Sequence, residues 1–405
     1  MTRAFRYLRG DKVIWAVIIF LSIVSLLAVY SSTGTLAYRF QGGNTAYYIL
    51  KHSTIMLVSL AIIFITHMIP YKFYSRLSQL FLFVSVILLS VTLLMGTNIN
   101  EASRWLTLPG LGFTIQTSDF AKLSLIMYLA RLLAQKQYEI KELKDSFISI
   151  LVPVLVICGL IMPANLSTSL ILFTTCIILM FVGRVRTRYM VVLTGSGLLL
   201  LSIFVAIAMY SRSEGRLGTW QNRIESYVSG TSEGNYQVEQ SKIAIATGGI
   251  LGKGPGNSSQ RNFLPHPYSD FIYAIIIEEY GLAGGIIIMF FYLWLLYRAG
   301  LIVKRSSRTF PAFLAFGLTL SIVMQAIINM AVVVNLLPVT GQPLPLVSMG
   351  GSSLVFTSIA LGIILSVSHG IQKHQEAGQP YNTHELSSSE AATDEYSWTV
   401  LEQEK

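Results

Sequence analysis

Asp270 is the residue of this sequence best placed to act as a general base. It stands in L-P-H-P-Y-S-D-F-I-Y-A-I-I-I-E-E-Y-G (residues 264–281), where a long polar stretch meets a long apolar one. A carboxylate at the rim of an apolar helix is half desolvated yet still reached by water, and partial desolvation raises its basicity. The competing interpretation is that Asp270 and Ser269 only cap the start of that helix. Polar residues elsewhere in the chain favour the base.

Asp119 and Lys122 are a second chemically suggestive pair. They stand three residues apart in Q-T-S-D-F-A-K-L (residues 116–123), at the start of an apolar stretch. This spacing places both side chains on one face of a helix, where they can form an ion pair. Charges inside an apolar span are costly and indicate function by default. The alternative is a structural ion pair that holds helices together.

Three further polar residues are candidates for binding a substrate. Arg104 lies in N-E-A-S-R-W-L (residues 100–106), where an interfacial tryptophan beside a snorkelling arginine explains the pattern equally well. Gln260 and Arg261 come from G-K-G-P-G-N-S-S-Q-R-N (residues 252–262). Its glycines allow tight turns close to a ligand, although a plain flexible loop is the commoner meaning of such a segment.

Ser348 lies in a segment that cannot be a regular helix. The segment T-G-Q-P-L-P-L-V-S-M-G-G-S-S (residues 340–353) contains two prolines and a glycine pair. Irregular backbone at membrane depth persists only where protein buries it or where it lines a wet cavity. We therefore expect it to form a cavity wall near Asp270.

Glu278 and Glu279 follow Asp270 in the same apolar stretch. At 1.5 Å per residue they should lie about 12 Å below Asp270, too deep for contact with lipid. We expect them to have a structural role, bonded to polar groups on neighbouring helices.

The composition requires that apolar helices position these residues. The 405-residue chain is 53% hydrophobic and only 12% charged, with a mean hydropathy of +0.60, whereas soluble domains carry about 25% charged residues. The net charge of +9 then indicates positive cytoplasmic loops rather than a nucleic-acid partner. Cys158 and Cys176 lie in apolar runs, which favours packing over a disulfide or a metal site.

The sequence predicts an all-α polytopic membrane protein with about ten transmembrane helices. A spanning helix needs about 20 apolar residues. The fourth span is shorter than that and must extend beyond its apolar ends to cross. The predicted spans are Val13–Tyr30, Ser53–Ile69, Leu77–Met95, Phe120–Leu133, Phe147–Met162, Leu166–Val182, Tyr189–Tyr210, Phe271–Tyr297, Phe310–Val334 and Ser352–Val367.

Lysine and arginine gather in the N-terminal segment and in alternate loops, which predicts that both termini are cytoplasmic. The domains are then a cytoplasmic segment (1–12), a transmembrane domain (13–370) and a polar cytoplasmic tail (371–405) that we expect to be disordered. The large extracytoplasmic loop between helices 7 and 8 covers residues 211–269, and residues 243–251 of it could form a short surface helix. The polar residues form four clusters, at residues 100–106, at residues 116–123, from Gly252 to Asp270 and at residues 340–353, and all four fall on the extracytoplasmic side.

These four clusters, in this order, resemble the SEDS family of bacterial cell-wall glycosyltransferases, the FtsW/RodA family. The resemblance runs from the first span to Val367. It implies a peptidoglycan glycosyltransferase that polymerises lipid II, a polyprenyl-linked disaccharide-pentapeptide, at the outer face of the bacterial cytoplasmic membrane. The residue to which it assigns catalysis is Asp270. The residues that match its central polar cavity are Arg104, Asp119, Lys122, Gln260, Arg261 and Ser348.

The resemblance also implies partners and a subfamily. Family members work with a class B penicillin-binding protein as transpeptidase and with other division proteins, within membrane lipid. The G-N-S-S-Q loop favours the FtsW type, and hence the division septum, over an elongation-type RodA role. The sequence departs from the family at Thr117, Asp119, Arg261 and Ser269, where proline, glutamate, lysine and threonine are usual. The charges and the hydroxyl are preserved.

Glycosyl transfer from a pyrophosphate needs a base for the incoming hydroxyl and positive charge for the leaving group. Asp270 suits the first role, while Arg104, Lys122 and Arg261 are candidates for the second. The sequence identifies no cofactor and no metal ligands, and it leaves Mg²⁺ or Mn²⁺ open. A lipid II transporter is the main alternative, but its polar residues should lie near the midplane, whereas these are one-sided. A non-catalytic scaffold would tolerate loss of Asp270.

Overall fold

The computed structural model describes most of the helical part of the chain. Residues 1–7, 211–232 and 377–405 are outside it, and with them parts of the predicted N-terminal segment, large loop and tail. The described residues are 8–34, 36, 38, 42–95, 97–99, 102–107, 114–137, 144–210 and 233–376.

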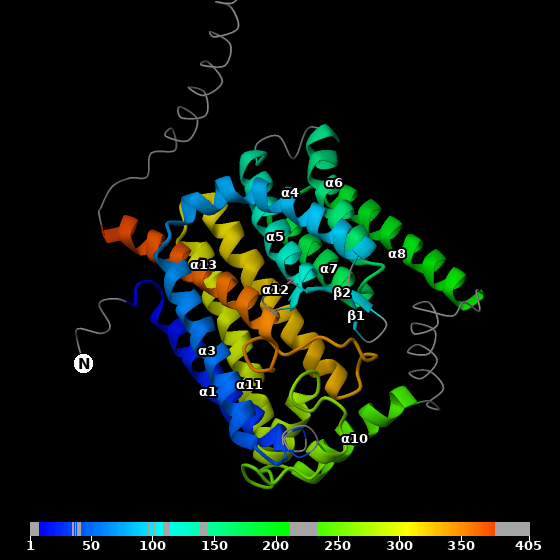
Figure 1. Cartoon of the computed structure of the whole chain (residues 1–405). Coiled ribbons are helices and arrows are strands. Elements are labelled where there is room, and N and C mark those ends of the chain that lie inside the picture. The colour runs from blue at the N-terminus through cyan, green and yellow to red at the C-terminus, as the bar shows by residue number, and fades with distance from the viewer. Residues whose placement is uncertain are drawn as a thin grey trace, which may run out of the picture.

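The described chain is a bundle of long helices with one small sheet (Figure 1). A helix lies at each of the ten predicted spans, and six helices (α1, α3, α4, α11, α12 and α13) are long and apolar enough to cross a membrane. This confirms the predicted fold class, while the number of crossings stays a prediction. The helices are α1 (Lys12–Ser32), α3 (Thr45–Met68), α4 (Tyr71–Met95), α5 (Thr117–Gln135), α6 (Lys144–Ile161), α7 (Leu166–Val182), α8 (Thr187–Tyr210), α10 (Glu233–Gly248), α11 (Ile272–Arg305), α12 (Thr309–Val333) and α13 (Gly351–Glu376).

Two helix boundaries differ from the sequence prediction in informative ways. Helix α5 extends beyond both apolar ends of the predicted fourth span, to Thr117 and Gln135, as crossing requires. Helix α10 begins at Glu233, before the predicted surface helix at residues 243–251, and it ends at Gly248. The chain cannot continue as a helix there because Gly249 and Gly252 both adopt positive φ.

A three-stranded antiparallel sheet precedes α5, and the sequence analysis did not predict it. Its strands are β1 (Thr97–Ile99), β2 (Ala102–Thr107) and β3 (Thr114–Gln116), in the order β1-β2-β3. Trp105 on β2 pairs with Gln116 on β3. Because β3 leads directly into α5, the sheet holds the segment that contains Arg104 beside the start of that helix.

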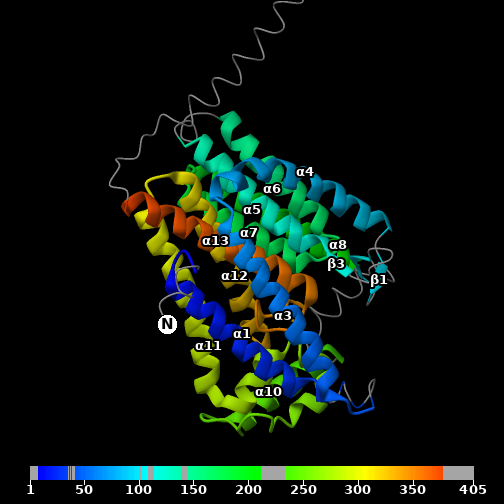
Figure 2. The same cartoon turned by 60° about the vertical axis from the view of Figure 1, so that its left-hand side comes forward.

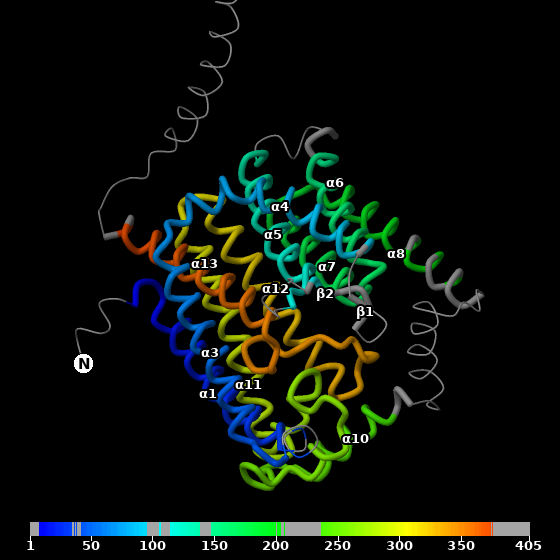
Figure 3. The backbone as a smooth tube through the Cα atoms, viewed as in Figure 1, coloured from blue at the N-terminus to red at the C-terminus, as the bar shows by residue number. Residues whose placement is uncertain are grey.

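Helix α12 packs against several other helices of the bundle. Helix α12 lies against α5, α7, α11 and α13, while α13 also packs on α3, and the turned cartoon and the tube view trace the same arrangement (Figures 2 and 3). A Cβ at Gly317 would lie 2.8 Å from side-chain atoms of Ile126 on α5 and of Leu179 on α7. A larger residue would therefore force these side chains to shift where the three helices meet. The end of the bundle where α1 and α12 finish and α5, α7 and α13 begin is called the α10 end below.

Helix α11 is broken at Gly281, whose φ of 70° and ψ of −178° are not helical. Its 34 residues would measure about 51 Å as one straight helix, against a hydrocarbon core of about 30 Å. The part after Gly281 is already long enough to cross. A Cβ at Gly281 would lie 2.1 Å from the carbonyl oxygen of Ile250, so glycine is required for the approach of the preceding loop.

The loop after α10 bonds to the backbone groups that the break sets free. The amides of Lys253 and Gly254 donate to the carbonyls of Glu278 and Glu279 at 3.0 and 2.9 Å. The amide of Leu282 in turn donates to the carbonyl of Gly249 at 2.9 Å. The break is thus stabilised by a backbone ladder.

Candidate active site

Asp270 lies just before α11 and is partly exposed. Its Oδ1 accepts a hydrogen bond of 2.9 Å from the hydroxyl of Ser269. The N-cap position of α11 is Phe271, one residue after Asp270, and the Phe271 side chain makes no cap hydrogen bond. Burial raises the pKa of the neighbouring Tyr268 hydroxyl, and the charges of Tyr48 and Asp270 raise it further.

Ser348 lies directly beside this segment. Its Oγ donates to the carbonyl of Ser269 at 2.6 Å and accepts from the amide of Leu344 at 2.8 Å. The amide of Met349 donates to the carbonyl of Tyr268 at 2.9 Å. The segments before α11 and before α13 therefore form one bonded unit, which brings the predicted residues Ser348 and Asp270 together.

The irregular segment before α13 is mostly buried in protein, whereas the sequence predicted a cavity wall near Asp270. Of residues 340–353, Pro345 and Ser353 line a small cavity, together with Asp119 and Lys122. Four carbonyls of the segment accept hydrogen bonds from side chains of α1, α11 and α12, which supply the partners that a helix would otherwise provide. Leu346 has a φ of 63°, a conformation that non-glycine residues keep only where their surroundings impose it. The bonds are Asn329 Nδ2 to Gln342 O (2.7 Å), Gln325 Nε2 to Pro343 O (2.9 Å), Tyr292 OH to Pro345 O and Ser25 Oγ to Val347 O (2.8 Å).

Asp119 and Lys122 form the predicted ion pair on α5. Lys122 Nζ lies 2.8 Å from Asp119 Oδ1 and donates to Gln325 Oε1 at 3.0 Å. Both side chains are nearly buried, with 11% of Lys122 and 6% of Asp119 exposed. They line a small cavity of about 40 Å³ between α5, α12 and α13. Among the residues that complete its lining are Ser321, Gln325, Pro345, Ser353 and Thr357.

Gln325 and Asn329 connect the Asp119–Lys122 ion pair to the segment of Asp270, and the sequence analysis missed both residues. They stand four residues apart on α12, about 6 Å along its axis. Gln325 contacts Lys122, while Asn329 Nδ2 donates to the carbonyl of Asp270 at 2.8 Å. Two amides on one face of an otherwise apolar span were the available signal.

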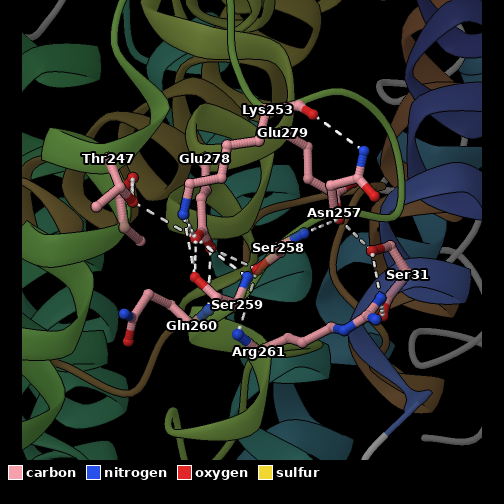
Figure 4. Close-up of polar contacts among 11 residues, drawn as sticks. Ser31, Thr247, Lys253, Asn257, Ser258, Ser259, Gln260, Arg261, Glu278 and Glu279 are labelled. Atoms are coloured by element: carbon pink, nitrogen blue, oxygen red, sulfur yellow. Dashed lines mark hydrogen bonds and ion pairs between the residues drawn. The ribbon is translucent and has the colours of Figure 1, made fainter.

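Arg261 and Gln260 lie in a separate cluster around Glu278 (Figure 4). Arg261 Nη1 donates to the carbonyl of Ser31 at 3.1 Å, and the amide of Gln260 donates to Glu278 Oε2 at 3.2 Å. Gln260 Oε1 is buried and has no partner among the described residues. These contacts tie both residues to Glu278 and α1, whereas Ser348 is bonded to the segment of Asp270.

Glu278 and Glu279 are buried and hydrogen-bonded, in agreement with a structural role. The sequence analysis expected partners on neighbouring helices, but most of the hydrogen-bond donors come from the loop after α10. Glu279 accepts a hydrogen bond from Ser31 in the last turn of α1, and from the amide of Ser258 at 3.3 Å. Donors to Glu278 are Lys253 Nζ (2.6 Å), Ser259 Oγ (2.8 Å), the amides of Ser259 (3.1 Å) and Gln260 (3.2 Å), Thr247 Oγ1 (3.5 Å) and Ser258 Oγ.

The predicted depth of these glutamates is wrong. Ser31, which contacts Glu279, stands next to the final residue of α1. Ser25, which contacts Val347 beside the Asp270 unit, lies six residues earlier, or about 9 Å further from the α10 end. Because α11 breaks at Gly281, its first turns run towards this end, so Glu279 does not lie below Asp270.

Two predictions can be followed only in part. Arg104 lies on β2, and its side chain is outside the described residues. Within the part of the chain that the structure describes, no three His, Cys, Asp or Glu side chains gather as a metal site would require. Cys158 and Cys176 are free and buried, as expected for packing residues.

Known proteins resemble this chain over most of its length. A family model described as "Cell cycle protein", covering FtsW, RodA and SpoVE, matches residues 11–373. A probable peptidoglycan glycosyltransferase FtsW of Trichlorobacter lovleyi is 33% identical over 92% of this chain and 96% of its own. Stage V sporulation protein E of Bacillus subtilis is 32% identical over 88% of this chain and 95% of its own.

Solved structures share the fold. The rod shape determining protein RodA of Thermus thermophilus superposes with a TM-score of 0.63 at 22% identity, covering 92% of this chain and 98% of that one. A chain of a peptidoglycan synthase complex that coordinates polymerization and crosslinking gives a TM-score of 0.67 at 22% identity, over 89% of this chain and 98% of that one.

Proposed function

Because this chain belongs to the FtsW/RodA/SpoVE family of cell cycle proteins, we propose that it polymerises lipid II into glycan strands with Asp270 as general base. Its curated relatives carry the name peptidoglycan glycosyltransferase, and this chain is an integral membrane glycosyltransferase of that family. The finer assignments are ours: the base, the substrate contacts and a role at the division septum.

The observation that carries the proposal is the unit that holds Asp270. Two segments distant in the sequence meet there, joined by Ser348 Oγ to Ser269 O at 2.6 Å. The carboxylate is partly exposed and oriented by the hydroxyl of Ser269 at 2.9 Å. An oriented, partly desolvated carboxylate within a rigid support is what a general base needs.

Asp270 would take the proton of the acceptor sugar hydroxyl as that oxygen bonds to the anomeric carbon of the donor. The bond from that carbon to the polyprenyl pyrophosphate breaks, and the pyrophosphate leaves with the electron pair. Its charge needs nearby donors. Lys122 has three N–H groups, of which Asp119 and Gln325 take two, so one is left for a phosphate oxygen.

The other candidate binding residues lie outside the Asp270 unit and the Asp119–Lys122 pair. Arg261 and Gln260 lie with Glu278 and Ser31, where they support the loop that leads to Asp270. Arg104, on the strand beside the start of α5, remains a candidate for the pyrophosphate.

The division role and the partner rest on similarity. Several relatives are named FtsW, which supports septal wall synthesis over an elongation role. One structural neighbour belongs to a complex for polymerization and crosslinking, which supports a class B penicillin-binding protein as partner. We propose an orientation with both termini in the cytoplasm, so that the α10 end faces outwards.

The deciding experiment supplies lipid II to the purified chain, alone and with its cognate transpeptidase, and examines the product on a gel. Glycan polymer is the expected result. A transporter would instead move fluorescent lipid II across liposome membranes without making polymer, and a scaffold would do neither. The bond pattern around Asp270 favours catalysis over both alternatives.

A further inference from the structure

His52 is a buried histidine that the mechanism above does not use. It lies on α3 with no exposed surface, and its Nε2 is 2.8 Å from the hydroxyl oxygen of Ser25 on α1. Ser25 is equally buried and donates to the carbonyl of Val347 at 2.8 Å. Burying an imidazole in an apolar bundle costs free energy unless its polar atoms are hydrogen-bonded. The hydrogen bond to Ser25 therefore helps to offset the cost of burying His52.

The hydrogen bonds fix the direction of the contact. Ser25 has a single hydroxyl proton, which points to Val347 O. Its oxygen must therefore accept from His52, which assigns the proton of the neutral ring to Nε2. His52 Nδ1 is buried and has no partner among the described residues. The ring thus acts as a donor that orients the hydroxyl of Ser25.

Ser25 in turn holds a strained part of the Asp270 unit. Val347 follows Leu346, whose φ is 63°, and a non-glycine residue keeps such a conformation only where its surroundings impose it. The next residue, Ser348, bonds to Ser269 O, and Ser269 Oγ bonds to Asp270 Oδ1. A continuous series of contacts therefore leads from α3 through α1 to the carboxylate.

We propose that His52 is a positioning residue for glycosyl transfer. It orients Ser25, and Ser25 fixes the backbone at Val347 and Ser348, from which Ser269 aims the carboxylate of Asp270. The inference rests on the proposed function, because its effect is exerted on the reaction at Asp270. A shift of about 1 Å at a reacting group can cost 10²-fold in rate, so a support remote from the substrate can govern turnover.

Two amide variants of His52 provide the test. Glutamine at this position can place an N–H near the position of Nε2, whereas asparagine is one bond shorter and cannot reach Ser25. With the full chain and its transpeptidase partner, we expect His52→Gln to retain kcat for lipid II polymerisation. We expect His52→Asn to lose about ten-fold or more in kcat, with KM and the thermal unfolding temperature equal to those of His52→Gln.

Ser59→Ala is the matched control. Ser59 lies two turns along α3 from His52, is also fully buried, and its Oγ has no partner among the described residues. This variant should leave kcat unchanged. A fall in kcat equal to that of His52→Asn would mean that any polar change on this face of α3 acts through packing, and it would overturn the proposal.

A double-mutant cycle checks the route through Ser25. Ser25→Ala and His52→Leu break the same series of contacts, so their effects on kcat should be far from additive, whereas additive effects would contradict the route. Equal kcat for His52→Gln and His52→Asn in an active background would overturn this inference alone. A wild-type chain that makes no polymer would overturn the proposed function and this inference with it.

Discussion

Lys122 Nζ lies 2.8 Å from Asp119 Oδ1, and the same ammonium donates to Gln325 at 3.0 Å. One charge therefore joins α5 to α12 and also lines the cavity between α5, α12 and α13. Asp119 Oδ2 is buried with no partner among the described residues. Both interpretations of the pair made from the sequence, structural and functional, have support in this geometry.

Lys122→Met should abolish polymerisation and also lower stability. It leaves the carboxylate of Asp119 buried without its cation, which can cost about 3–5 kcal/mol. The double variant Asp119→Asn, Lys122→Met removes that uncompensated charge and should recover much of the thermal unfolding temperature. If it also recovers polymerisation, Lys122 holds no phosphate and its role is structural.

Gly281→Ala should be among the most damaging small substitutions in the chain. The new Cβ would lie 2.1 Å from the carbonyl oxygen of Ile250, at a φ of 70° that alanine disfavours. Gly300→Ala on the same helix is the matched control, because no atom outside the neighbouring backbone of its own helix lies within 4 Å of the added Cβ. That change should be neutral or stabilise by up to about 1 kcal/mol. Thermal unfolding in detergent compares the two, and equal unfolding temperatures would contradict the break in α11.

Glu278→Gln should loosen the loop after α10 far more than Glu279→Gln. Both oxygens of Glu278 accept hydrogen bonds, so an amide nitrogen would face a donor whichever way it turned. Glu279 accepts fewer hydrogen bonds, from Ser31 and Ser258 at Oε1 and from the backbone of Gly256, so an amide there opposes fewer donors. We expect a loss of about 1–3 kcal/mol for the first variant. Hydrogen exchange of the Gln260 amide should rise in Glu278→Gln alone, and a rise of the same size in both variants would contradict this.

The orientation can be checked by cysteine labelling at exposed positions. With a cytoplasmic N-terminus, Asn262→Cys should react with an impermeant maleimide from outside the cell and Ser307→Cys only after permeabilisation. Both residues are exposed, whereas Ser348 retains only 2% of its surface and would report poorly. Labelling of position 307 in intact cells would reverse the predicted topology.

Much of this architecture could be predicted because it follows from local patterns. Apolar runs of membrane length marked the ten helices, and the three-residue spacing of Asp119 and Lys122 gave their ion pair. The prolines before α13 correctly indicated an irregular segment, although most of it is buried in protein rather than exposed in a cavity wall. Each of these features depends on residues close together in the sequence, and the regular geometry of the helix fixes how such residues lie relative to one another.

The remaining features depend on contacts between distant segments. The break at Gly281 requires the loop after α10 to supply hydrogen bonds, which no pattern within α11 reveals. In the sheet before α5, strands β1 and β3 have three residues each, too short to give an alternating signal. Strand β2, with the sequence A-S-R-W-L-T, does not alternate apolar and polar residues. The role of Gln325 and Asn329 becomes clear only from their hydrogen bonds to the segment before α13.

Asp270→Asn tests the assignment of the base. Asparagine keeps the size of the side chain and can still accept the hydrogen bond from Ser269, but it cannot take up a proton. Loss of a general base typically lowers the rate by about 10²–10⁴-fold, so lipid II polymerisation should fall close to background. The variant should keep the wild-type unfolding temperature and its transpeptidase partner, and it should therefore act as a dominant negative in cells. Near-normal polymer formation would remove Asp270 from the chemistry and direct attention to Asp119, a carboxylate that lines the cavity between α5, α12 and α13.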